Sequence, residues 1–230
     1  MDRFRNIQQS GGLDVEIPQD SSNSEVPANK KQAQTLRARE IICDATIVCL
    51  EKFGYAETTI NRIVEEAGVS RGALQHHFPS KEDLITETAD RLLQRTIRPR
   101  EREKSRARAS DPTAQVAHEI RFLWERLVNT NEYRALLEIL TASRTDQQLK
   151  KRISSTLHNW NKAIEQNSID LYESVDRDDE DVRVLGIMQR VFMRGMLVQY
   201  QYSDDAEDLE KVVTRFIDLV APHLRPRTHR

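Results

Sequence analysis

Apolar residues recur with helical spacing through most of this 230-residue chain. In its second half they return every three or four positions, which places them on one face of a helix. Five helices are expected there, over about 112–129, 132–143, 146–175, 181–202 and 206–224. No segment alternates apolar and polar residues in the way that a half-buried strand does. The pattern therefore predicts an all-α fold.

The first half shows four more helical patterns with clear signals between them. The first is expected over about 34–53, and the second ends at Gly68, because glycine tolerates a positive φ angle. Ser70 can cap the third helix with its hydroxyl, and Pro79 ends that helix. The fourth is expected over about 81–97. Two short helices joined by such a tight turn indicate a helix-turn-helix, whose second helix enters the major groove of DNA.

A longer motif runs through the same segment. Its parts are Thr58-Thr59, Ala67-Gly68-Val69-Ser70, Gly72-Ala73-Leu74, His77-Phe78 and Ser80-Lys81-Glu82-Asp83-Leu84. With this motif, the segment from Leu36 to Leu84 resembles the amino-terminal DNA-binding domain of the TetR family, the tetracycline-repressor-like regulators. The family usually has tyrosine where this chain has Gln75. An amide able to pair with adenine therefore replaces a phenol.

The resemblance implies about nine helices arranged in two domains. Residues 31–80 would form the helix-turn-helix DNA-binding domain, and residues 81–230 a helical domain for ligand binding and dimerisation. Residues 1–30 are rich in Ser, Asn, Gln, Gly and Pro, which predicts a disordered arm. That arm is either an inert extension or a flexible DNA contact. The basic stretch 95–109 is likewise either a solvated helix end or a second contact with DNA or an acidic partner.

The resemblance also implies where DNA would bind. Arg71 could bind guanine through two hydrogen bonds, and small side chains beside it would let the helix approach the bases. Polar groups at the starts of the helices would contact phosphate or a neighbouring base, and further basic residues would add phosphate affinity. The predicted DNA-binding residues are Thr59, Asn61, Ser70, Arg71, Gly72, Ala73, Gln75, His76, Lys81, Lys30, Lys31 and Arg37.

The family's second domain implies a pocket for a small, mostly apolar molecule with one or two polar groups. The ligand-binding candidates are His118, Arg121, Trp124, Tyr133, Trp160, Met188, Phe192 and Met196. Aromatic and methionine residues at this spacing also fit a plain helical core.

The family also implies a homodimer formed through the last two expected helices. The dimer candidates are Val191, Gly195, Val198, Leu209, Val213, Phe216 and Val220. Gly195 lies in mid-helix, where glycine lowers helix stability by roughly 1 kcal/mol relative to alanine. A close helix crossing would explain it, and the alternative is packing inside its own subunit.

The composition of the chain limits the classes of protein and the cellular compartments that are expected. Apolar residues make up 38% of the chain, charged residues 31%, and the formal net charge is −2. Such a balance argues against a protein that coats nucleic acid non-specifically, so DNA affinity must come from a local basic surface. No apolar run reaches the ~18 residues of a membrane span, and no secretory signal opens the chain. A cytoplasmic protein is expected.

The two cysteines, Cys43 and Cys49, do not share a helix face. We therefore expect neither a disulfide nor a metal pair, but buried structural thiols, with a redox sensor as the alternative.

Motifs of catalysis are missing from the sequence. It contains no HExxH, no GxSxG, no Walker loop and no dinucleotide fingerprint, so neither an enzyme nor a cofactor is expected. We expect a sequence-specific transcriptional regulator, in the family's usual form a homodimeric repressor released from a pseudo-palindromic DNA operator by a small-molecule effector. The alternative is an architectural or partner-binding protein of the same fold. It would bind DNA without sensing a ligand and would show a collapsed core.

Overall fold

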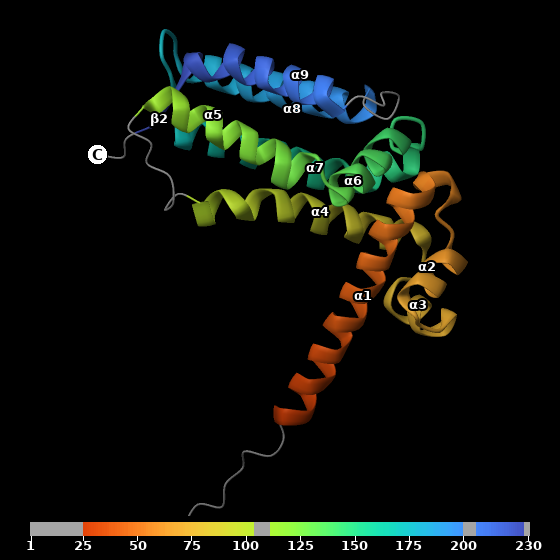
Figure 1. The fold of residues 1–230 in the computed structure, drawn as a ribbon. Coiled ribbons are helices and arrows are strands. Elements are labelled where there is room, and N and C mark those ends of the chain that lie inside the picture. The colour runs from red at the N-terminus through yellow and green to blue at the C-terminus, as the bar shows by residue number, and fades with distance from the viewer. Residues whose placement is uncertain (1–24, 104–110, 200–205, 228–230) are drawn as a thin grey trace, which may run out of the picture. The chain divides into compact units, whose positions relative to one another are not determined.

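The computed structural model describes residues 25–103, 111–199 and 206–227 (Figure 1). The chain divides into two compact units, Met1–Arg37 and Ala38–Arg230, and the first is described from Glu25 onward. The described helices are α1 (Glu25–Glu57), α2 (Ile60–Ala67), α3 (Arg71–His77), α4 (Lys81–Glu103), α5 (Pro112–Leu123), α6 (Asn131–Ala142), α7 (Gln147–Leu171), α8 (Asp179–Gln199) and α9 (Ala206–Val220). The all-α class and the number of about nine helices are confirmed for these residues.

Four shorter elements complete the described residues. They are a π-helical turn η1 (Trp124–Val128), a 3-10 turn η3 (Ala221–His223), and the strands β1 (Tyr172–Ser174) and β2 (Leu224–Pro226). α1 begins inside the stretch that was expected to form an arm, and residues 1–24 lie outside the described residues. No described helix is long and apolar enough to cross a lipid bilayer.

The helix-turn-helix forms where its local signals predict it. Gly68 ends α2 with a φ angle of 64°, in the left-handed region that glycine enters without strain. Ser70 caps α3 by accepting a hydrogen bond of 3.1 Å from the Ala73 amide. Ser80 caps α4 in the same way, at 3.1 Å from the Asp83 amide. One of the orphan N–H groups at each of these helix starts therefore has a side-chain partner.

A small core holds this region together, and a larger one fills the carboxy-terminal helices. The small core consists of Ile42, Cys43, Ala45, Cys49, Ile63, Leu74, Phe78 and Leu84. Both thiols are buried and free, and burial raises the pKa of each. In the larger core, α7 packs against both α4 and α8, and α5 packs against α9 (Figure 1).

Three expected helices end earlier than their apolar pattern suggests. The helix expected over 112–129 changes into a π-helical turn at Trp124, whose carbonyl accepts from the Asn129 amide at 2.8 Å. The helix expected to reach residue 175 ends at Leu171, and the last helix ends at Val220 instead of residue 224.

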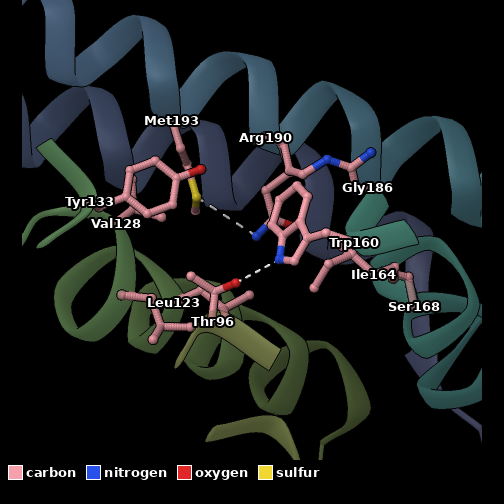
Figure 2. A pocket seen from close by; sticks show the side chains of 12 residues that line it. Thr96, Leu123, Val128, Tyr133, Trp160, Ile164, Ser168, Gly186, Arg190 and Met193 are labelled. Atoms are coloured by element: carbon pink, nitrogen blue, oxygen red, sulfur yellow. Dashed lines mark hydrogen bonds between the residues drawn. The ribbon is translucent and has the colours of Figure 1, made fainter. Parts of the chain in front are cut away.

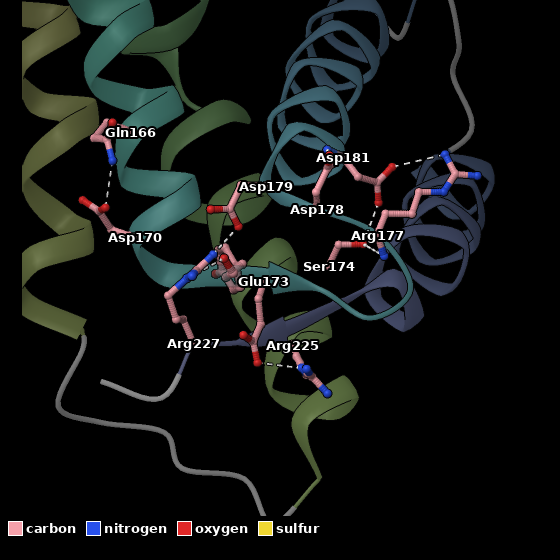
Figure 3. Close-up of polar contacts among 11 residues, drawn as sticks. Gln166, Asp170, Glu173, Ser174, Arg177, Asp178, Asp179, Asp181, Arg225 and Arg227 are labelled. Atoms are coloured by element: carbon pink, nitrogen blue, oxygen red, sulfur yellow. Dashed lines mark hydrogen bonds and ion pairs between the residues drawn. The ribbon is translucent and has the colours of Figure 1, made fainter. Parts of the chain in front are cut away.

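Beyond α7 the chain forms β1, which pairs antiparallel with β2. Beyond α9, Pro222 lies in the η3 turn, and proline has no N–H to continue an α-helix. Glu173 lies opposite Arg225, and the Arg225 Nε atom donates to its carboxylate at 2.7 Å (Figure 3). The Arg227 guanidinium donates to the Asp179 carboxylate at the start of α8. These contacts join residues about fifty positions apart, which local apolar spacing does not reveal.

Candidate DNA-reading surface and ligand cavity

One face of α3 is exposed, and the opposite face is anchored by Leu74, which is fully buried. We call the exposed residues Arg71, Gly72, Ala73, Gln75 and His76 the reading surface. A Cβ atom built on Gly72 meets no neighbouring atom within 4 Å. This surface therefore combines polar side chains with two small residues, which suits close approach to base edges in the major groove.

Residues of α2 and the turn border the reading surface. Arg71 Nη1 donates to Asn61 Oδ1 at 3.2 Å, so the two predicted DNA contacts are already joined. Thr59 caps α2 by accepting from the Arg62 amide at 3.4 Å. The hydroxyls of Thr59 and Ser70 serve here as acceptors for backbone amides, and a hydroxyl in that role keeps its own proton for a phosphate oxygen.

Lys81 is partly turned into the protein. Its Nζ atom donates to the Tyr55 carbonyl at 3.1 Å and lies 4.7 Å from the centre of the Tyr55 ring. Desolvation by this burial lowers the pKa of its ammonium. An ammonium has three donors, so the Tyr55 contact leaves room for the expected phosphate contact.

The three predicted phosphate contacts of α1 belong to the first compact unit. Lys30 and Arg37 are exposed there, and the side chain of Lys31 lies outside the described residues. Their placement relative to α3, which belongs to the second unit, is therefore not described.

A cavity of about 60 Å³ lies among α4 to α8 (Figure 2). Its lining residues are Thr96, Leu123, Leu127, Val128, Tyr133, Trp160, Ile164, Ser168, Gly186, Gln189, Arg190 and Met193. The Trp160 indole nitrogen donates to the Thr96 hydroxyl at 2.8 Å. Outside the lining set, Arg194 Nε donates to the Tyr133 hydroxyl at 3.0 Å. Of the eight ligand-binding candidates, Tyr133 and Trp160 line this cavity.

The other six candidates lie elsewhere. Arg121 donates to Glu210 and Thr214 on α9, and His118 is exposed. Trp124 is buried in the core, and Met196 packs against it. Phe192 stacks on Phe216 with ring centres 3.9 Å apart. Met188 faces outward with 52% of its surface exposed. Sequence reasoning favoured large side chains and missed the polar lining residues Thr96, Gln189 and Arg190. In the sequence, these residues could have been recognised only as polar positions on otherwise apolar helix faces.

The dimer candidates also divide. Val191 and Val198 are exposed on α8, as is Gly195, where a built Cβ meets nothing within 4 Å. Packing inside its own subunit thus does not explain this glycine. On α9, in contrast, Val213 and Val220 are buried in the core of their own chain.

The remaining two candidates are partly buried, since Leu209 packs against the core and Phe216 stacks on Phe192. These four α9 residues therefore fit an interface poorly. In the single chain these side chains are turned toward the core, and the exposed apolar residues of α9 lie at other positions.

A continuous exposed stripe runs along α8. It consists of Val184, Met188, Val191, Gly195 and Val198, and we call it the α8 stripe. Its members are spaced by four, three, four and three residues, the heptad spacing by which helices pair along a seam. Val212 and Leu219, seven residues apart on α9, are exposed as well. Val184, Met188, Val212 and Leu219 are therefore exposed apolar residues that were not among the dimer candidates.

The chain matches known proteins over most of its length. Residues 42–88 match the family model described as bacterial regulatory proteins, tetR family. The chain is 27% identical over 188 residues to the HTH-type transcriptional regulator CymR of Pseudomonas putida, covering 80% of this chain and 90% of that protein. It is 25% identical to the HTH-type transcriptional repressor AcnR of Corynebacterium diphtheriae, over 87% of this chain and 97% of that one.

Solved structures share the fold. A transcriptional regulator from Saccharomonospora viridis, solved in complex with choline, superposes with a TM-score of 0.61 at 17% identity. The match covers 83% of this chain and 99% of the other. The helix-turn-helix geometry, the family model and these relatives agree. Residues 42–88 therefore carry the helix-turn-helix domain of the tetR family of bacterial regulatory proteins, and the chain is similar over most of its length to helix-turn-helix regulators of transcription.

Proposed function

We propose that the protein is a homodimeric repressor that binds a pseudo-palindromic operator and leaves it when a small, mostly apolar molecule binds. The carrying observation is the reading surface, with Arg71 and Gln75 exposed over the buried anchor Leu74. Residues 31–80 would bind DNA, and residues 81–230 would dimerise and hold the ligand. Arg71 would bind guanine, and Gln75 would bind adenine.

The α8 stripe supports the dimer. Isolated exposed apolar residues are ordinary, but a contiguous line at heptad spacing usually marks a partner helix. Gly195 in the middle of the stripe would let two helices approach closely. A twofold dimer would present two copies of α3 about 34–36 Å apart, one turn of B-DNA, as operator half-sites require.

Helix α4 offers the connection between ligand and DNA. Near its end, Thr96 lines the cavity and accepts from Trp160. At its start, Asp83 accepts from Arg152 of α7, and Lys81 contacts Tyr55. A ligand would shift the DNA-binding equilibrium if its affinity differs between two positions of α4.

The first test is selection of bound sequences from random duplex DNA at near-physiological salt. We expect an enriched inverted repeat, and Arg71→Ala should relax preference at one position of each half-site, costing roughly 1–3 kcal/mol. Binding without enrichment that disappears as salt rises would reflect phosphate attraction alone and would refute the proposal.

The volume of the cavity favours a second candidate, a DNA-binding protein of this fold without ligand sensing. About 60 Å³ is well below the roughly 300–1,000 Å³ of ordinary ligand pockets. Once the selected DNA is known, a broad screen of small molecules separates the two candidates. Release from DNA by any of them supports the repressor, and unchanged affinity with all of them supports the second candidate.

A further inference from the structure

Two arginines lie beside the aromatic wall of the cavity. Arg190 and Arg194 are four residues apart on α8, so they share a helix face. Their guanidinium carbons lie 6.0 and 5.7 Å from the centre of the Trp160 ring. Arg190 lines the cavity (Figure 2), and Arg194 reaches it through the hydroxyl of Tyr133.

The two arginines have different recorded partners. Glu165 lies 3.5 Å from Arg190 Nη2, whereas Arg194 donates to a neutral phenol. A guanidinium has five N–H donors, and the phenol contact of Arg194 uses one. Among the described residues, no carboxylate contacts Arg194, so its partly buried guanidinium keeps charge and donors for a ligand. A partly buried cation favours binding of an anion.

The rest of the cavity is suited to an apolar body. Leu123, Leu127, Val128, Ile164 and Met193 line it together with the Trp160 ring. An anionic group at the arginines and a hydrocarbon or aromatic group against these side chains would satisfy both kinds of surface.

A surface cleft adjoins the cavity. It has a volume of about 240 Å³ and shares three lining residues with the cavity, Thr96, Leu127 and Tyr133. Leu127 belongs to the π-helical turn η1, a kind of irregularity that is often found at functional sites. These three side chains therefore border both spaces.

The cleft carries basic residues of its own. Arg126 is exposed at its rim together with Glu132, and Arg95 pairs with Asp44 at 2.9 Å. The cleft is therefore not acidic, and an anion could approach the arginines of α8 through it.

We propose that the cavity binds a small organic acid, with its carboxylate held by Arg190, Arg194 and the Tyr133 hydroxyl and its apolar body against Trp160. The acid enters through the cleft between α4 and α6, past Thr96, Leu127 and Tyr133. The acid would be the effector of the proposed repressor. Only this regulatory role rests on the proposed function. Binding of the acid can be measured without DNA.

The test uses the purified full chain and matched pairs of probes. The acids are phenylacetate, 3-phenylpropionate, hexanoate and octanoate, and each is compared with its primary amide at constant ionic strength. Binding is followed by Trp160 fluorescence in a Trp124→Phe background, because the chain has two tryptophans, and is checked by calorimetry. At least one acid should bind about tenfold or more tightly than its amide, as expected for a charge-assisted hydrogen bond.

Three variants locate the anion. Arg190→Gln and Arg194→Gln should each weaken binding of that acid about tenfold or more and leave binding of its amide unchanged. Arg183→Gln is the matched control, because Arg183 lies on the same helix, pairs with Glu180 and does not line the cavity. If a glutamine variant does not fold, Arg194→Lys and Tyr133→Phe replace it. Each keeps most of the packing and should still lower the preference for acid over amide.

Two results would overturn the proposal. One is a panel in which no acid binds more tightly than its amide, and the other is an acid whose affinity is unaffected by the variants. A different result would contradict the proposed repressor function alone. An acid that binds through the arginines but leaves the DNA affinity unchanged supports the anion site and contradicts its regulatory role.

Discussion

At the scale of single residues, the reading surface was predictable because it depends on local register. Once Leu74 is buried, helical geometry fixes which neighbouring side chains on α3 face outward. The hydrogen bond between Arg71 and Asn61 was not predictable, since it crosses the turn between two helices. The same limit applies to Lys81 and the Tyr55 carbonyl, whose contact spans 26 residues.

Asn61→Ala should weaken operator binding by removing the group that holds Arg71. The net contribution of one such hydrogen bond, about 0.5–1.5 kcal/mol, corresponds to roughly a two- to tenfold loss. Fluorescence anisotropy with the selected operator measures it. Asn131→Ala is the control, because Asn131 forms a similar bond with Arg134 away from α3. If Asn61 acts through Arg71, its loss should have no further effect in an Arg71→Ala background; a fully additive loss would show that Asn61 contacts DNA itself.

The two cysteines should react slowly in the folded protein. Burial raises the pKa of Cys43 and Cys49, so at pH 8 the folded chain holds less of the reactive thiolate than the unfolded chain does. Mass spectrometry after iodoacetamide treatment should show modification mainly once urea has unfolded the protein. Rapid alkylation of either native thiol, accompanied by loss of operator binding, would instead support the redox-sensor alternative.

At the scale of elements, helix ends with local signals were predictable, and those set by distant contacts were not. Gly68 and Ser70 end and begin helices as expected, because each acts on its own neighbours. The end of α7, in contrast, is followed by a strand that pairs with the distant β2. The non-helical residue inside α1, Gly54, lies where the first helix was expected to end, and a distant contact adds to this local signal. Gly54 has a φ angle of 71°, and the amide of Tyr55 that follows donates to Glu138 at 3.1 Å.

Gly54→Ala should lower the free energy of unfolding by about 1–2 kcal/mol, because alanine is strained at this positive φ angle. The new Cβ would also lie 3.0 Å from Glu138 Oε2. Urea denaturation followed by circular dichroism measures the change. Gly72→Ala is the control, since Gly72 lies in α3 with open space around it and should become slightly more stable. Equal stabilities of the two variants would contradict the strain at Gly54.

At the scale of the whole molecule, the packing of helices against one another determines which residues are buried and which line the cavity, and the sequence does not show this packing. Apolar spacing identifies a helix face but not its neighbour, so Val213 and Val220 were expected at a dimer interface and lie in the core. For the same reason most ligand-binding candidates lie outside the cavity, which is formed by side chains from five helices and the η1 turn. The α8 stripe shows the opposite case, because its heptad spacing is a local property.

Val191→Arg should convert the proposed dimer into a monomer. Val191 is 66% exposed in the single chain, so arginine should leave the fold intact while placing like charges against each other across a twofold axis. Analytical ultracentrifugation would show the change in mass. Val175→Arg is the control, because Val175 is an exposed valine outside the α8 stripe. A dimer that persists in Val191→Arg, or is lost in Val175→Arg, would place the interface elsewhere.

The pairing of β1 with β2 bears on the order in which the protein folds. Tyr172 lies opposite Pro226, so the strands meet only after the intervening chain, with α8 and α9, has closed into a loop. Contacts of long sequence separation cost closure entropy and tend to form slowly. The same pairing brings Arg227 to Asp179, at the first turn of α8 (Figure 3). We therefore expect the start of α8, which begins just before the stripe proposed to join two subunits, to become fixed late in folding.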